Sequence, residues 1–365
     1  MSNEAMSRRQ LLATLGAAGI GAIGATMATT GIVTGNALSM NRVTGQVYGD
    51  GEELCDPTFC TLESMFDLVG RVGGRDGEAV VLLSYRPGTG LGGGLFYWDS
   101  ARSKSAHNGG AIVSPTVPLL PDFSNLDNYL NGVGETDPTG SGCWVRPRHA
   151  EIPLEQFGID PTGLTDSYTV IMKAAAYAAT FNGNPPGQSY QTNVGATLVF
   201  PRGSIRIDSE IVFAGWGIHL RGHGRMTRIC NGGSFSGEAY FRFYNAATYL
   251  TDVSCRDIAF DGRGLAVKGV IFQRCRNSAV ASGLSGQYMG GALVKALECD
   301  MWLIDDIFFI PLVSGASANG VEIIDGNEGV LSRAKLFGWN NTAGTEKTNG
   351  SAVYIENNEE VKLFA

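Results

Sequence analysis

An ordered series of segments between residues 157 and 230 constrains this chain more than any other feature. A glycine-rich loop at residues 157–166 precedes an alanine-rich stretch, which is followed by Gly195-Ala-Thr-Leu-Val-Phe-Pro-Arg-Gly203 and Gly217-Ile-His-Leu-Arg-Gly-His-Gly224. From residue 196 onward the pattern changes to short β-rich segments. A stack of strands needs cover at its first edge, so we predict that the alanine-rich stretch is a helix lying on that edge.

The predicted helix spans residues 168–180. Its apolar residues share one face at helical spacing, which suits a helix that lies flat on an apolar surface. These residues are Val170, Ile171, Ala174, Ala175, Ala178 and Ala179. Thr165 or Asp166 can accept a hydrogen bond from the first free N–H groups of the helix.

The series as a whole resembles the entrance to a right-handed parallel β-helix of the pectate-lyase-like superfamily. There, a signature of the form F-G-A-x-G-D-G-x-T-D-D-T precedes a capping helix, then G-G-x-V-x-F-P-x-G-x-Y and strands built around G-x-G. The resemblance implies an all-β fold in which residues 151–365 are the N-terminal part of the β-helix. The usual handedness of parallel crossovers also favours a right-handed coil.

Cysteine spacing gives a second indication of stacked coils. Cys230, Cys255, Cys275 and Cys299 are separated by 25, 20 and 24 residues, which is about one coil of a solenoid. We therefore expect these four thiols to be buried, reduced and stacked inside the coils. Cys55 and Cys60 are close enough in sequence to pair, but the odd total of seven cysteines and the four at coil spacing favour buried thiols.

The segment before the β-helix, residues 41–150, has a different composition. It contains four β-prone or glycine-rich pieces, at residues 80–85, 94–99, 108–113 and 142–147. In this order they are similar to the small β-domain that precedes the β-helix in many phage tailspikes and capsule depolymerases. The resemblance implies a small β adaptor domain that binds the phage particle.

Gly88-Thr-Gly-Leu-Gly-Gly93 matches the G-x-G-x-x-G pattern of a dinucleotide-binding loop. That loop must open a helix, because the helix N-terminus holds the pyrophosphate. The residues that follow are Leu95-Phe-Tyr-Trp98, which are aromatic and β-prone. We therefore predict a hairpin turn here and expect no nucleotide cofactor.

The N-terminus supports two interpretations. Residues 7–16, Ser-Arg-Arg-Gln-Leu-Leu-Ala-Thr-Leu-Gly, and the apolar Gly/Ala-rich sequence up to Val33 look like a twin-arginine (Tat) export signal. Phage tailspikes that resemble the rest of the chain can carry a similar segment, which would then be an uncleaved anchor. We favour a helical anchor at residues 1–40 over a cleaved signal. Gly and Thr interrupt the segment throughout, so no membrane span is expected.

Charge and histidine usage exclude some kinds of partner. The net charge is −8 and the pI is about 5.1, which argues against a nucleic acid, whose phosphates need a basic surface. Neutral or weakly charged carbohydrate is compatible with this balance. The four histidines, His107, His149, His219 and His223, form no metal-binding pattern, so no metal site is expected.

Candidate catalytic residues come from an alignment of three predicted coils. Glycoside hydrolysis needs two carboxylates, and neighbouring coils lie about 4.8 Å apart, so acidic residues at equivalent positions reach a suitable separation. Leu297-Glu-Cys-Asp, Ile324-Asp-Gly-Asn and Ile355-Glu-Asn-Asn can be laid over one another. One predicted column is Glu298, Asp325 and Glu356, and a second is Asp300, Asn327 and Asn358.

Glu298 and Asp325 are the first candidates, and Asp300 and Asp305 come next. Solvated carboxylates on an outer face are the alternative interpretation. No spacing singles out the basic residue that a lyase would need. The remaining acidic candidates are Asp257, Asp261, Asp306 and Glu322.

The resemblance implies a phage tailspike of the virion tail. Such a protein is a homotrimer that attaches to tail or baseplate proteins through its N-terminal region. It recognises and depolymerises a capsule or O-antigen polysaccharide. The chain ends in the middle of a predicted coil, so we expect a longer protein whose active site extends beyond Ala365.

Two alternatives remain open at this point. One is a Tat-exported bacterial polysaccharide lyase or hydrolase, periplasmic or secreted, with the same β-helix. The other is a non-catalytic receptor-binding or adaptor protein whose β-helix only displays a binding surface.

Overall fold

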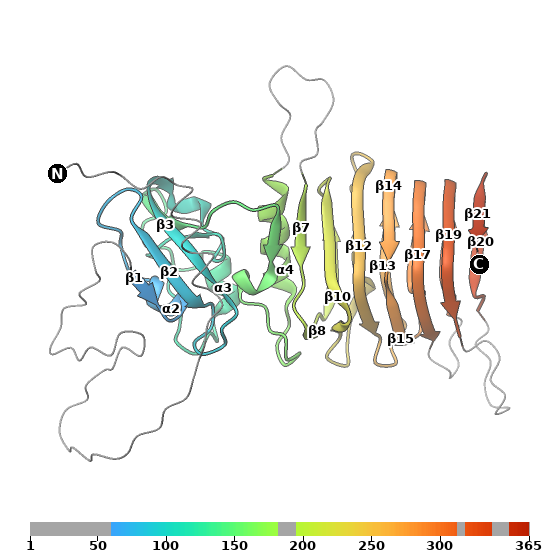
Figure 1. Ribbon diagram of the computed structural model, residues 1–365, viewed down its shortest axis with the longest axis horizontal. Coiled ribbons are helices and arrows are strands. Elements are labelled where there is room, and N and C mark those ends of the chain that lie inside the picture. Colours follow the sequence, from blue (N-terminus) through green and yellow to red (C-terminus); the bar gives the residue numbers. More distant parts are fainter. Residues whose placement is uncertain (1–59, 182–194, 312–317, 338–349, 365) are drawn as a thin grey trace, which may run out of the picture. The chain divides into compact units, whose positions relative to one another are not determined.

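The computed structural model describes residues 60–181, 195–311, 318–337 and 350–364 (Figure 1). The anchor predicted at residues 1–40 lies outside the described residues. Residues 55–365 form one compact unit, so the division predicted at residue 150 stays a prediction. The helices of the described residues, with 3-10 helices marked η, are α2 (Met65–Leu68), η1 (Lys104–Ala106), α3 (Leu126–Leu130), η2 (Leu154–Phe157) and α4 (Tyr168–Ala179).

The first sheet contains five strands in the order β1-β2-β3-β5-β4. Its strands are β1 (Cys60–Leu62), β2 (Ala79–Ser84), β3 (Gly92–Ser103), β4 (Ile112–Val113) and β5 (Ser141–Val145). β1 pairs with β2 in parallel, and the other pairs are antiparallel. Trp98 and Trp144 pack edge to face across β3 and β5, with ring centroids 5.2 Å apart. Cys60, at the start of this sheet, is disulfide-bonded.

The glycine-rich turn at residues 88–93 joins the antiparallel strands β2 and β3, which confirms the hairpin interpretation. The buried Arg146 holds the end of this turn. Its Nη2 and Nη1 donate hydrogen bonds to the carbonyls of Gly92 (2.6 Å) and Gly93 (2.7 Å). A Cβ at Gly92 would lie 1.9 Å from the carbonyl oxygen of Glu155, so the turn packs directly against η2 and needs glycine.

The helix α4 occupies residues 168–179, one residue shorter than the range expected from the sequence. Val170, Ile171, Ala174, Ala175 and Ala178 are buried, whereas Ala179 is exposed. The helix contacts β7 (Ala196–Val199), β9 (Ser209–Phe213) and β10 (Ile218–Cys230), the first strands of the stack. Asp166 Oδ1 accepts a hydrogen bond from the N–H of Tyr168, as expected for one of the two proposed capping residues.

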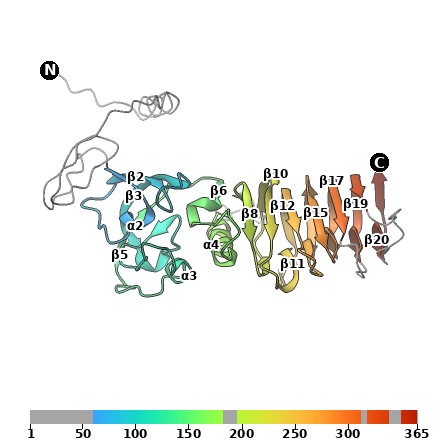
Figure 2. The ribbon, with the colours of Figure 1, turned by 90° about the horizontal axis from the view of Figure 1, so that it is seen from below.

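The rest of the described chain is a parallel β-helix. One long sheet has the order β21-β19-β17-β14-β12-β10-β7-β6, and a second has the order β20-β18-β16-β13-β11-β9; all of their pairs are parallel. Figures 1 and 2 show these strands side by side from β7 to β21. The further strands are β6 (Glu151–Pro153), β8 (Gly203–Arg206), β11 (Ser236–Phe243), β12 (Leu250–Asp261), β13 (Lys268–Gln273), β14 (Cys275–Ser282), β15 (Ser285–Met289), β16 (Val294–Leu297), β17 (Asp300–Pro311), β18 (Val321–Ile324), β19 (Asn327–Leu336), β20 (Val353–Glu356) and β21 (Val361–Phe364).

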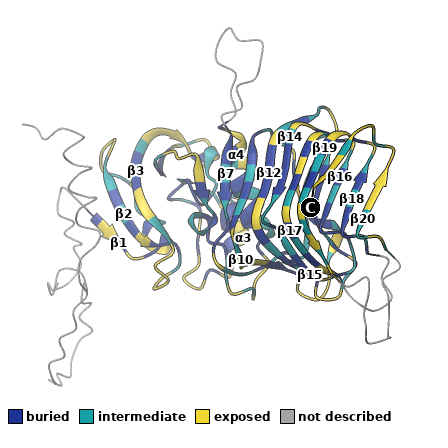
Figure 3. Cartoon of the chain, turned by 45° about the vertical axis from the view of Figure 1, so that its right-hand side comes forward, coloured by how far each residue is buried: buried dark blue, intermediate teal, exposed yellow. Residues whose placement is uncertain are grey.

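Side chains of alternate residues fill the inside of the coils, and Figure 3 shows buried and exposed residues alternating along the strands. Phenylalanines from successive coils stack there: the ring centroids of Phe213 and Phe243 are 5.2 Å apart, and those of Phe243 and Phe272 are 5.0 Å apart. The outer positions of the same strands carry most of the polar and charged side chains. The interior therefore stabilises the stack, and the outer columns are left for recognition.

The four coil-spaced cysteines are buried and free, as predicted. The predicted single stack is wrong. Cys230 pairs in register with Asp261, and Cys255 pairs with Leu220 and Ala281. Cys275 and Cys299 do lie in adjacent coils, where the Cys275 thiol donates to the carbonyl of Gln273 (3.6 Å) and the Cys299 thiol to that of Phe272 (3.2 Å). Coil lengths vary, so near-equal spacing in sequence does not place all four in one column.

The buried thiols should resist modification in the folded protein. Burial raises the pKa of Cys255, and the neighbouring Cys299 thiol together with burial raises the pKa of Cys275, so neither forms the reactive thiolate at neutral pH. We expect an aromatic disulfide reagent to leave Cys230, Cys255, Cys275 and Cys299 unmodified in native protein. All four should react once guanidinium chloride is added.

Peptide mass spectrometry after native labelling measures this outcome at each site. Labelling of any of the four before unfolding, or a disulfide among them, would contradict the inward packing.

Candidate functional site

One corner of the β-helix is built from single residues with a left-handed backbone. Arg274, Glu298, Asp325 and Asn357 have φ angles of 55°, 52°, 52° and 50°. Each follows the last residue of a strand of the second sheet, at the point where the chain bends. Asn and Asp tolerate this conformation better than other non-glycine residues. Asp325 and Asn357 therefore have a conformational reason to lie at this corner, whereas Arg274 and Glu298 do not.

Strand register places Glu298 and Asp325 in adjacent coils. Leu297 pairs with Ile324, and the Glu298 N–H donates to the carbonyl of Ile324. The prediction that Glu356 is the third member of this column is wrong. Ile324 pairs with Glu356, so the residue at the corner is Asn357. Asn357 Nδ2 donates to Asp325 Oδ1 at 3.0 Å.

The second predicted column changes in the same way. Asp300 pairs with Asn327, as expected. Asn358 is not in that column, because it lies beside Gly326, whose N–H donates to Asn358 Oδ1 at 2.9 Å. The alignment of the last coil was one residue out of register, and this shift explains both corrections.

Two arginines and a tyrosine lie next to the candidate carboxylates. Leu250 pairs with Cys275, which places Tyr249 one coil before Arg274. The guanidinium carbons of Arg276 and Arg274 lie 3.6 and 5.0 Å from the centroid of the Tyr249 ring. The Nε atoms of the same arginines lie 3.8 Å from carboxylate oxygens of Asp300 and Glu298 respectively.

We refer to this set as the corner ribbon. It consists of Tyr249, Arg274, Arg276, Glu298, Asp300, Asp325 and Asn357. Sequence reasoning did not single out Tyr249, Arg274 or Arg276. A signal was available, because Gln273-Arg-Cys-Arg276 can be laid over Leu297-Glu-Cys-Asp300 with the cysteine in the same place.

Asp305 lies apart from the corner ribbon, at a different bend of the same coil. Its carboxylate accepts hydrogen bonds from Ser332 Oγ (2.7 Å) and from Arg333 Nε (2.8 Å), and it also pairs with Arg333 Nη2. The bonds from Arg333 and Ser332 lower the pKa of Asp305 to about 2. This carboxylate is ionised at neutral pH and engaged by its neighbours, so it is a poor proton donor.

The corner ribbon has the parts needed to contact a sugar polymer. Glu298 and Asp325 are exposed, and coils about 4.8 Å apart bring their carboxylates to a separation of the order used by glycosidases. The path from the coil of Tyr249 to that of Asp325 is roughly 14 Å at this spacing. An aromatic ring, guanidinium donors and carboxylate acceptors therefore follow one another along the coil axis.

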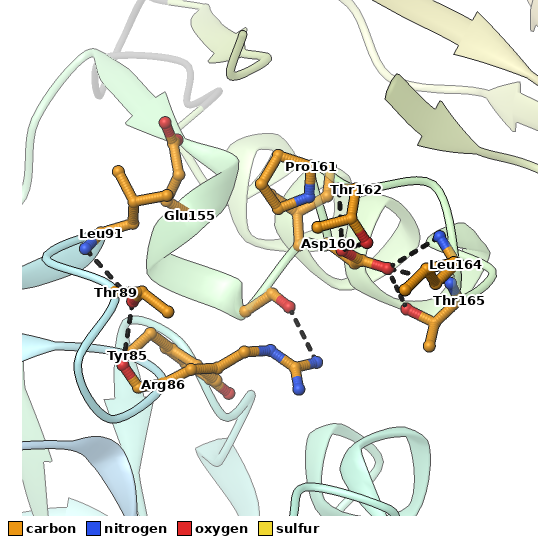
Figure 4. Close-up of a pocket in the computed structure, with 12 residues that line it drawn as sticks. Tyr85, Arg86, Thr89, Leu91, Glu155, Asp160, Pro161, Thr162, Leu164 and Thr165 are labelled. Atoms are coloured by element: carbon orange, nitrogen blue, oxygen red, sulfur yellow. Dashed lines mark hydrogen bonds between the residues drawn. The ribbon is translucent and has the colours of Figure 1, made fainter. Parts of the chain in front are cut away.

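A pocket of about 290 Å³ lies between the β2–β3 turn and the loop after η2 (Figure 4). Leu91, Ile159, Pro161 and Leu164 contribute to its lining, and Arg86 Nη2 donates to the carbonyl of Gly158 at 3.3 Å.

Asp160 is the carboxylate of this loop. It accepts hydrogen bonds from Thr162, Leu164 and Thr165, and although partial burial opposes ionisation, bonds from Thr162 and Thr165 lower its pKa to about 2. In Figure 4 the Glu155 carboxylate points away from Asp160. This pocket thus contains a structural carboxylate rather than an acid–base pair.

Within the described ranges, His, Cys, Asp and Glu side chains form no group of three or more that could bind a metal ion. Among the helices of the described residues, none has both the length and the apolar character needed to cross a bilayer.

The left-handed corner predicts opposite effects for two kinds of substitution. Asn fits this backbone well and Glu does not, so Glu298→Asn should raise the free energy of unfolding by about 0.5–1 kcal/mol. A β-branched residue is disfavoured there, so Asp325→Val should lower it by about 1–2 kcal/mol, whereas Asp325→Asn should have little effect. Urea denaturation of the three variants measures these differences. Equal stabilities for Asp325→Val and Asp325→Asn would contradict the corner geometry.

Residues 61–149 match the family model of the phage tail protein small four-stranded beta-sheet domain. No curated protein sequence matches the chain.

Several solved structures have a similar fold at low identity. The gp42 tailspike of Acinetobacter phage vb_AbaP_AS12 aligns with a TM-score of 0.50 at 10% identity, over 76% of this chain and 48% of that one. WceF of Pantoea stewartii, described as a glycan biofilm modifying enzyme with a tailspike-like parallel β-helix, aligns with a TM-score of 0.49 at 15% identity, over 88% and 42%. Tailspike protein 2 of the Escherichia coli O157:H7 bacteriophage CAB120 gives 0.49 at 12%, over 83% and 40%.

The chain thus spans less than half the length of these three structures. Residues 61–149 are thus similar to a phage tail small β-sheet domain, and the parallel β-helix that follows them has a fold similar to that of a phage tailspike.

Proposed function

We propose that this protein is a phage tailspike that attaches to the virion tail and recognises a bacterial surface polysaccharide. The match of residues 61–149 to a phage tail domain, directly ahead of a tailspike-like β-helix, is the observation that carries this proposal. Its partners would be tail or baseplate proteins at the N-terminal region and two further copies of the chain in a homotrimer. Capsule or O-antigen polysaccharide would be the ligand.

The corner ribbon is the proposed contact surface for the polysaccharide. Tyr249 holds the two guanidinium groups through its ring, and the arginines and carboxylates offer donors and acceptors to sugar hydroxyl groups. These groups project from consecutive coils at regular spacing. A polymer that lies along the coil axis would therefore meet equivalent positions one after another.

We further propose that Glu298 and Asp325 are the carboxylate pair of a depolymerase. If the reaction is hydrolytic, one carboxyl group would protonate the leaving oxygen and the other would act as base or nucleophile. Asp300, paired with Arg276, would bind sugar beside them. Asp305 has a low pKa and a full set of partners, and we give it a positioning role.

Two other functions share the β-helix and remain as alternatives. A Tat-exported bacterial polysaccharide lyase or hydrolase would use the same ribbon without a virion. A receptor-binding or adaptor protein would bind polysaccharide there without cleaving it. The two experiments below separate these possibilities.

The depolymerase proposal predicts loss of cleavage without loss of fold. The full chain should release reducing ends from purified capsule or lipopolysaccharide of its bacterial host. General acid–base catalysis by a carboxyl group accelerates a reaction by about 10²–10⁴-fold. Glu298→Gln and Asp325→Asn should therefore each lower the cleavage rate by at least about 100-fold. Reducing-end assays measure the rate, and thermal melting of each variant measures the fold.

Glu328→Gln is the matched control, because Glu328 is an exposed carboxylate with a left-handed backbone at a different corner. It should cleave at the wild-type rate. Polysaccharide binding without any cleavage would favour the adaptor alternative. Normal cleavage by both ribbon variants would exclude Glu298 and Asp325 as the catalytic pair.

The attachment proposal predicts that residues 1–40 are needed for incorporation into phage particles but not for polysaccharide binding. A variant without residues 1–40 should remain soluble and bind polysaccharide with wild-type affinity, but it should not be incorporated into phage particles. Immunoblots of purified virions measure incorporation, and N-terminal sequencing of the native protein tests whether Met1 is retained. A start near residues 26–38 in a periplasmic or secreted fraction would instead support the exported enzyme.

A further inference from the structure

The outer face of the second sheet carries a compact charge cluster around Glu238. Its Oε2 accepts a hydrogen bond from Arg242 Nη2 at 2.7 Å. Its Oε1 accepts from Lys268 Nζ at 3.0 Å and from Lys295 Nζ at 3.3 Å. Three cations from the neighbouring strands β11, β13 and β16 thus converge on one carboxylate. We refer to Arg242, Lys268 and Lys295 as the cation cradle.

The partners of the three cations are unequal. Arg242 also donates to Glu210 Oε1 (3.2 Å) and to Gln273 Oε1 (2.9 Å). Lys268 also lies 3.7 Å from Glu322 Oε2. Within the described part of the chain, Glu238 is the only carboxylate within ion-pair distance of Lys295. If Glu238 moved away, Glu210 and Glu322 would balance two of the three positive charges of the cradle. The one remaining positive charge matches the single negative charge of a carboxylate ligand.

Burial distinguishes the cradle from the residue that fills it. The side chains of Arg242, Lys268 and Lys295 are 15, 18 and 15% exposed, whereas that of Glu238 is 39% exposed. Ile271 of β13 is buried between register partners Arg242 and Lys295, so the cradle has a fixed floor. The cations are therefore held in place, and the carboxylate is the outermost member of the cluster.

The backbone at Glu238 is the irregular part of this sheet. Gly237 has a φ of 124°, and the pairing of β11 with β9 shifts register between Ser236 and Phe241. Bulged segments depart from the ladder and re-aim their side chains. Although partial burial opposes ionisation, hydrogen bonds from Arg242 and Lys268 lower the pKa of Glu238 to about 2, so its carboxylate is charged at neutral pH. Glu238 thus occupies the cradle in the ionic form that a sugar carboxylate would have.

The cradle lies close to the corner ribbon. Lys295 and Glu298 are three residues apart on one coil, a path of roughly 10 Å along a strand. A glycan that lies on the ribbon would therefore have a branch or neighbouring sugar within reach of the cradle.

We propose that the cation cradle is a binding site for the carboxylate of an acidic sugar and that Glu238 occupies it as a displaceable internal competitor. This inference rests on the proposed function only for the source of the ligand, a polysaccharide that contains acidic sugars. The main alternative is a structural one, in which the cluster only links adjacent coils through ion pairs. A structural cluster would not discriminate between acidic and neutral sugars.

Isothermal titration calorimetry of the full chain with D-glucuronate tests the proposal, with D-glucose as the neutral probe. Glu238→Gln keeps the shape of the side chain but removes its charge. It should bind glucuronate at least tenfold more tightly than the wild type and should not gain affinity for glucose. Adding Lys295→Met, which keeps the length of the side chain, should abolish the gain.

Glu238→Asp is the second variant, because it keeps the charge in the cluster and withdraws the carboxylate by one methylene group. It should show a smaller gain of about two- to fivefold, and it remains informative if Glu238→Gln does not fold. No gain for glucuronate in the folded variants, or an equal gain for glucose, would overturn the proposal. Calorimetry measures binding and not cleavage. Failure of the corner ribbon to cleave polysaccharide and failure of the cation cradle to bind glucuronate are therefore distinguishable.

Discussion

The structure depends on parallel coils that stack in register about 4.8 Å apart. In-register stacking forces equivalent residues of successive coils into columns, so each inner column must be apolar and each outer column is free to vary. Phe213, Phe243 and Phe272 meet this requirement inside, where their rings stack from coil to coil. The corner ribbon and the cation cradle are the outer counterparts of the same constraint, because both place polar groups in columns at the spacing of the coils.

Turn-forming residues and the periodicity of apolar residues predicted the turn and the capping helix of this fold well. The hairpin at residues 88–93 follows from β-prone residues on both sides of a glycine-rich turn, and α4 follows from an apolar stripe at helical spacing. These signals depend only on near neighbours in sequence. The parallel β-helix was expected from the resemblance of residues 157–224 to the entrance of such a fold and from the coil-like spacing of the cysteines, because short β-rich segments alone do not decide between parallel and antiparallel pairing.

Register was predictable only where the coils have similar lengths. The pairing of Asp300 with Asn327 was correct, but the next coil is longer, and the shift of one residue moved Glu356 out of the corner column and Asn357 into it. The same variation in coil length separates Cys230 and Cys255 from the column of Cys275 and Cys299. The contact of Arg276 with Tyr249 could not be derived, because it depends on which column each side chain occupies.

The left-handed corner gives a way to separate conformational from functional reasons for a residue. Asp325 and Asn357 suit this backbone, so their presence needs no further explanation. Glu298 has the same φ without that preference, and its carboxylate is close to Arg274 without a direct hydrogen bond. The backbone therefore accounts for Asp325 and Asn357 at this corner but not for a glutamate at position 298. Of the two candidate carboxylates, Glu298 is therefore the one whose identity the fold alone does not explain.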